Sequence, residues 1–104
     1  MLFEKKFSEG DVVTLKVISG EEILGRFVSE DMSSITISKP LMIAMTPKGP
    51  AMAPVMITVN PETQLSFNKQ AIIVSAMCFK EIADQYIYQT TGIQPVSAGS
   101  IVTG

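Results

Sequence analysis

Apolar and polar residues alternate along most of the segment between residues 12 and 37. Apolar side chains recur at every second position in three short runs, which is the period of a strand with one buried face. A turn at Gly20 separates the first two runs, and an acidic, serine-rich turn at residues 30–34 separates the last two. The pattern predicts a three-stranded antiparallel meander, with one apolar face formed by Val13, Leu15, Val17, Ile23, Phe27, Ile35 and Ile37.

Gly25 lies inside the second predicted strand, residues 22–30, at a position where a side chain would pack. A glycine there is typical of a bend, a bulge or a close approach of two backbones. Pro40 ends the third predicted strand, because proline lacks an N–H and demands an edge, a bulge or a break. We therefore expect a strongly bent sheet that curls toward a small barrel.

Residues 40–57 hold four of the six prolines and four of the seven methionines. A turn signal at residues 46–50 predicts a long hairpin. Its return strand is expected over residues 52–59, with an interruption at residues 60–63 before it resumes. Two interpretations stay open: the hairpin fills irregular space in an oligomer, or it offers an adaptable, methionine-rich surface to a protein partner.

The last predicted strand, residues 71–77, is apolar on both faces, as in a central or interface-buried strand. Residues 80–91 then predict a helix that Gly92 stops and that lies on the open barrel. We expect a short arm at residues 1–10 and a flexible tail at residues 93–104. The helix carries one apolar stripe at Phe79, Ile82, Ala83, Tyr86 and Ile87.

Composition refines this picture. A chain of 104 residues is long enough for one domain. With 46% hydrophobic and only 17% charged residues, it has more apolar surface to bury than a monomer of this size usually can. Oligomerisation is therefore expected. No apolar run reaches the roughly 20 residues of a spanning helix, so we expect no membrane contact and a cytoplasmic location. A net charge of −2 argues mildly against indiscriminate binding to phosphate backbones.

Histidine is absent, which removes the usual general base, the Ser/His/Asp arrangement and the common zinc sites. The single cysteine, Cys78, has no partner for an internal disulfide and is expected in the core. The sequence therefore predicts a protein that is not an enzyme and that uses no metal or other cofactor.

A bent five-stranded antiparallel sheet with a C-terminal helix fits an SH3-like barrel, an OB-fold or the Sm fold, and periodicity alone does not choose among them. Gly20, Gly25 and Asp31, within alternating strands, resemble the first motif of the Sm-like (LSm) family. Residues 67–72, FNKQAI, resemble the second motif in its bacterial host-factor form. The hairpin, low pI and helix also resemble phage-encoded Sm-like proteins.

The resemblance extends over residues 10–77 and implies one Sm-like domain at residues 1–92, with residues 40–57 as a hairpin insertion. It also implies a homo-oligomeric ring, in which the fourth strand of one copy pairs with the fifth strand of the next. Five to seven subunits are expected. The apolar strand at residues 71–77 independently favours such a neighbour.

The family also binds single-stranded RNA near the pore of the ring, so the resemblance implies an RNA site. The family's acidic position falls on Asp31 and its basic position on Lys69, while its base-stacking position falls on a serine. The implied RNA-binding residues are Asp31, Ser33, Ser34, Asn68, Lys69 and Gln70. An RNA-chaperone-type module is thus expected; the alternative is a ring for protein interaction or assembly that binds no RNA.

Overall fold

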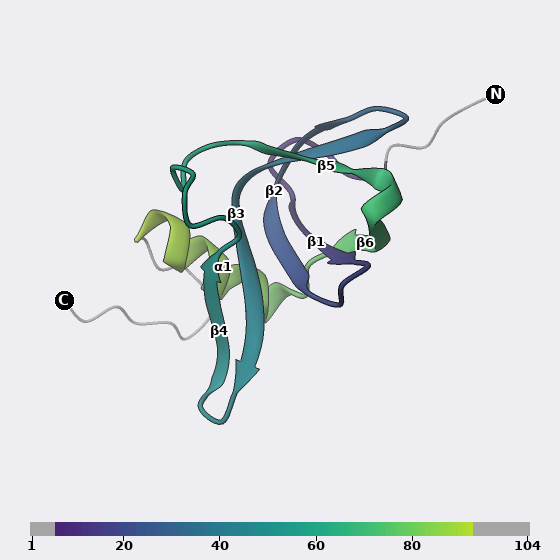
Figure 1. Cartoon of the computed structure of the whole chain (residues 1–104). Helices are drawn as coiled ribbons and strands as arrows, with labels where there is room; N and C mark the ends of the chain where they lie inside the picture. The colour runs from purple at the N-terminus through teal and green to yellow at the C-terminus, as the bar shows by residue number, and fades with distance from the viewer. Residues whose placement is uncertain (1–5, 93–104) are drawn as a thin grey trace.

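A computed structural model describes residues 6–92, which form a mostly antiparallel β-sheet and one C-terminal helix (Figure 1). The predicted tail at residues 93–104 lies outside the described residues. The strands are β1 (Val12–Val17), β2 (Glu22–Glu30), β3 (Ser34–Thr46), β4 (Gly49–Pro54), β5 (Leu65–Asn68) and β6 (Ile72–Met77). The 3-10 turn η1 (Lys69–Ala71) connects β5 to β6, and helix α1 (Lys80–Thr91) follows β6.

The strand order is β4-β3-β2-β1-β6, and β5 pairs separately with β3. Strand β3 pairs with β2 along one edge. Along its other edge, the first half of β3 pairs with β5 and the second half with β4. No pairing joins β5 to β6 within residues 6–92, so the sheet is open and unclosed. The expected five strands are therefore six, because the return segment divides into β4 and β5 instead of forming one interrupted strand.

The predicted apolar face is confirmed as the main core. Val13, Leu15, Ile23, Phe27, Ile35 and Ile37 are buried in one cluster, with Val17 at its edge. Phe7 joins this cluster, and its ring centroid lies 5.6 Å from that of Phe27. The predicted short arm at residues 1–10 is thus attached to the core through the large apolar ring of Phe7, while its residues 1–5 lie outside the described residues.

Gly25 marks both a bulge and a close approach. A Cβ atom on Gly25 would lie only 2.6 Å from Cδ1 of Ile37. Leu24 pairs with Leu41 but Arg26 pairs with Ser38, so Lys39 and Pro40 together oppose Gly25. Of the alternatives at Pro40, the structure has the bulge, and β3 continues through it to Thr46. The residue beside the proline, Lys39, has a left-handed φ of 49°.

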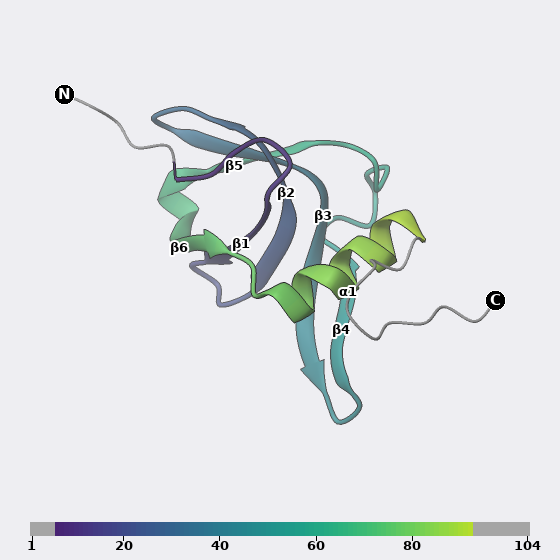
Figure 2. The same cartoon turned by 180° about the vertical axis from the view of Figure 1, so that it is seen from behind.

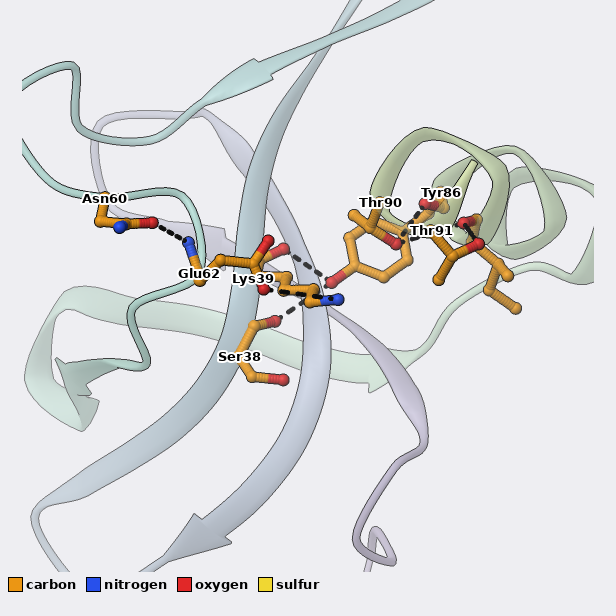
Figure 3. Close-up of polar contacts among 8 residues, drawn as sticks. Ser38, Lys39, Asn60, Glu62, Tyr86, Thr90 and Thr91 are labelled. Atoms are coloured by element: carbon orange, nitrogen blue, oxygen red, sulfur yellow. Dashed lines mark hydrogen bonds and ion pairs between the residues drawn. The ribbon is translucent and has the colours of Figure 1, made fainter. Parts of the chain in front are cut away.

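Helix α1 covers the opposite face of the sheet, as the two views show (Figures 1 and 2). Tyr86 is completely buried in a second core with Val12 and Leu24. Its hydroxyl donates hydrogen bonds to the carbonyl oxygens of Ser38 at 3.1 Å and Lys39 at 2.6 Å (Figure 3). This contact fastens the helix to the β3 bulge. Gly92 stops the helix in a left-handed conformation, as predicted.

The rest of the predicted helix stripe is confirmed except at its start. Ile82, Ala83 and Ile87 pack against the second core. Phe79 is 68% exposed, because it precedes the helix and its ring is not turned into the core.

The half-buried Cys78 lies beside the same core, and burial raises the pKa of its thiol.

The β3–β4 hairpin projects from the body of the molecule, as Figure 1 shows. Within the described part of the chain, no helix has both the length and the apolar character needed to cross a lipid bilayer.

A candidate nucleic-acid interface

Asp31 builds the turn between β2 and β3. Its Oδ1 accepts hydrogen bonds from the backbone N–H groups of Ser33 and Ser34, both at 2.8 Å. The two serine hydroxyls also donate to this oxygen, at 3.1 and 3.3 Å. These donors stabilise the ionised carboxylate and lower the pKa of Asp31, with the backbone N–H of Ser33 contributing most. The first predicted site residue therefore acts as an organiser of the turn.

Asn68 organises the corner between β5 and β6 in the same way. It precedes η1, and its side-chain oxygen accepts a hydrogen bond from the backbone N–H of Gln70 at 2.8 Å. Such capping orders the first residues of the turn. The side chains of Lys69 and Gln70 therefore project from a defined backbone.

The turn and the corner are adjacent in space although more than 30 residues separate them in sequence. Ser34 pairs with Asn68 in the β3–β5 register. The backbone N–H of Lys69 donates to the carbonyl oxygen of Ser33 at 2.8 Å. The structure thus gathers all six predicted site residues, which we call the polar cluster: Asp31, Ser33, Ser34, Asn68, Lys69 and Gln70.

Glu30 is a neighbour of the polar cluster that sequence reasoning missed. Its Oε2 lies 2.9 Å from Nζ of Lys69, so the cationic group of the cluster is already paired. The carboxylates of Glu30 and Asp31 and the ammonium of Lys69 together carry a net charge of −1, and of the two carboxylates it is Glu30 that pairs with Lys69. The signal available in the sequence was the adjacent Glu30–Asp31 pair, but its relation to Lys69 depends on the β3–β5 register.

A cavity of about 250 Å³ opens beside the Lys69–Glu30 ion pair. Ile35, Ile72 and Ile73 contribute aliphatic walls, and Ser75 contributes a hydroxyl. The cavity lies beside η1, which connects β5 to β6. These two strands do not pair with each other in the described residues. Aliphatic surface is therefore available next to the cluster, although no aromatic side chain belongs to the cluster.

The described residues contain no group of three or more histidine, cysteine, aspartate or glutamate side chains that could hold a metal ion. The contacts within the cluster are hydrogen bonds and the Lys69–Glu30 ion pair. No protein-family model matches this chain, and no curated protein matches it at a significant level.

Proposed function

We propose that this chain is an Sm-like subunit of a homo-oligomeric ring that binds single-stranded RNA at the polar cluster. The hydrogen bond from Lys69 N–H to the Ser33 carbonyl carries the proposal. It joins the two segments that resemble the Sm motifs into one surface, and it does so through backbone atoms that any side-chain variation would leave in place.

Two open strand edges support the ring. Strand β5 pairs only with β3 and strand β6 only with β1 in the described structure, so each has one unpaired side. Val74 and Met77 of β6 are 53% and 54% exposed, an uncommon state for apolar strand residues. Pairing of β6 with β5 of a neighbouring copy would satisfy both edges and cover these side chains. Five to seven copies would close the ring.

The bases would be held mainly by hydrogen bonds and aliphatic contact. Gln70 offers both a donor and an acceptor to a base edge, and Ile72 offers aliphatic contact in the adjacent cavity. Glu30 neutralises Lys69, so each subunit would contribute little to counterion release. The resulting expectation is modest affinity for a single strand with an unusually weak dependence on salt.

Titration with labelled oligo-U and oligo-A, at low and moderate salt, tests the proposal. Lys69→Ala should weaken binding, because it removes the ammonium from the cluster. Lys80→Ala is a matched control, since Lys80 is also ion-paired, with Asp84 at 2.8 Å, but lies on the helix. Absence of binding by the wild type, or equal losses in both variants, would overturn the RNA function.

A second candidate function is protein interaction or assembly through the hairpin of residues 40–57. The observation in its favour is Met45, which is 78% exposed near the tip of the hairpin. Ala44 pairs with Ala51, so an Asn-Gly turn in place of residues 45–50 gives a shorter hairpin in the same register. This trimmed variant should lose a protein partner in pull-downs while keeping its oligomeric state, and unchanged capture would count against the function.

A further inference from the structure

The apolar face of the β3–β4 hairpin extends beyond the helix that covers its base. Leu41, Ile43 and Met52 on this face pack against the second core. Met45 lies two residues beyond Ile43, on the same side of the strand, and is exposed. The second core therefore continues into an apolar surface that no described part of this chain covers.

This surface forms one wall of a groove of about 420 Å³. Ile43, Ala44 and Met45 of β3 make that wall, and the start of α1 makes another with Phe79 and Ile82. The β1–β2 turn closes the third side. The volume falls within the usual range of ligand and peptide pockets, about 300 to 1,000 Å³.

The groove has an acidic rim. Glu21 and Glu22 both line it from the β1–β2 turn. Glu22 is paired with Lys16 at 3.7 Å, whereas Glu21 accepts a hydrogen bond from the hydroxyl of its neighbour Ser19. Lys16 does not line the groove, so its charged lining groups are carboxylates. The rim therefore complements a cation.

The outer edge of β4 is poorly suited to strand addition, so a partner of the hairpin is expected to bind a face of it and not that edge. Pro50 and Pro54 pair with Met45 and Leu41 of β3. A proline within a ladder turns its missing N–H outward, toward the free edge. Residues 50, 52 and 54 are two apart, so their backbone nitrogens point to the same edge of β4. Two of the three are prolines, and Met52 is the one that has an N–H to offer there.

We propose that this groove docks a segment of another protein that carries large apolar side chains flanked by lysine or arginine. The apolar side chains continue the second core across Leu24, Ile43 and Ile82, and the cation meets the carboxylates of Glu21 and Glu22. The proposal rests on the second candidate function and is independent of the ring and of RNA. It names the site and the partner chemistry that the hairpin function requires.

The probe is a short, labelled, acetylated peptide of alternating leucine and lysine, followed by fluorescence anisotropy. Two matched peptides replace every lysine with glutamate or every leucine with serine. Binding of the leucine-lysine peptide should exceed that of both controls at least tenfold. Peptide binding should also slow the alkylation of Cys78 by iodoacetamide several-fold, because Cys78 lines the groove.

Two variants locate the binding site. Met45→Arg introduces a bulky cation at an exposed wall residue on the same side of β3 as Ile43, and Glu21→Lys reverses the rim charge at another exposed position. Each should weaken peptide binding at least tenfold, with thermal unfolding unchanged. Glu9→Lys, an equal charge reversal at an exposed residue outside the groove, is the control and should bind as the wild type does.

Three outcomes would overturn the proposal. One is equal binding of the glutamate peptide, and another is undiminished binding by Met45→Arg. The third is a change in the sedimentation of the free protein on Met45→Arg, since a second copy would then be the occupant. If the trimmed hairpin loses its protein partner while Met45→Arg retains it, the hairpin function stands and only the groove assignment fails.

Discussion

The hydroxyl of Tyr86 donates a hydrogen bond to the backbone carbonyl of Lys39 at 2.6 Å, which joins the C-terminal helix to the bulge of β3 (Figure 3). Lys39 has a left-handed φ of 49°, an uncommon conformation for a residue with a side chain. The Lys39 ammonium also lies 3.6 Å from the carboxylate of Glu62, in the segment that leads to β5. The bulge is therefore held from two sides.

Tyr86→Phe should destabilise the protein by about 1 to 3 kcal/mol, because it leaves the carbonyl groups of Ser38 and Lys39 without this donor. Urea unfolding measures the loss. Tyr88→Phe is the matched control, since Tyr88 lies on the same helix and is 52% exposed. Equal effects of the two substitutions would show that the hydroxyl of Tyr86 does not anchor the bulge.

Alkaline pH should weaken the fold through the same residue. Burial raises the pKa of Tyr86 to about 12 from its ordinary value of 10.0. The unfolded chain therefore loses this proton more readily, and the stability that Tyr86 contributes below pH 10 is lost as the pH rises toward 12. The difference in unfolding free energy between wild type and Tyr86→Phe should shrink across that window, and a constant difference would contradict the assignment.

Gly25→Ala should destabilise the sheet by about 1 to 3 kcal/mol, the usual cost of overpacking. The added Cβ would lie 2.6 Å from Cδ1 and 2.9 Å from Cβ of Ile37, and the second contact cannot be relieved by rotating the side chain. Urea unfolding again measures the change. A neutral result would mean that β2 and β3 can separate at the bulge without loss.

Val74→Asp should convert the proposed ring into smaller species, because it places a charge at an exposed apolar position of β6, the strand whose free edge would pair with the neighbouring copy. Sedimentation of the wild type should give five to seven copies. Ile57→Asp, at a residue that is 95% exposed in a loop, should leave the assembly intact. A wild-type monomer at micromolar concentration would refute the ring itself.

Glu30→Gln should strengthen binding of oligo-U, because it removes a carboxylate that lies 2.9 Å from the Lys69 ammonium. The released lysine should steepen the dependence of log K on log salt by about 0.7 for each phosphate it newly contacts. Glu22→Gln changes the net charge equally and breaks a different ion pair, that with Lys16. Identical gains in both variants would mean that Glu30 does not restrain the site.

Local sequence determined much of this fold. Alternation predicted the face that buries Val13, Leu15 and Ile37, because the period of a strand decides which side chains share a face. Helical spacing and a terminal glycine predicted α1 with its bounds at residues 80–91. Gly25 was correctly expected at a bulge or close approach, since an unexplained glycine in a strand has few other uses.

Tertiary structure alone decided the pairings on which the candidate site depends. Sequence could not show that the return segment divides between two halves of β3, because the pairing of each strand is set by contacts distant along the chain. That division brings Lys69 beside Ser33 and, at the same time, beside Glu30. The resemblance of two segments to the Sm motifs indicated the residues of the polar cluster. The pairing of Lys69 with Glu30 followed only from the fold.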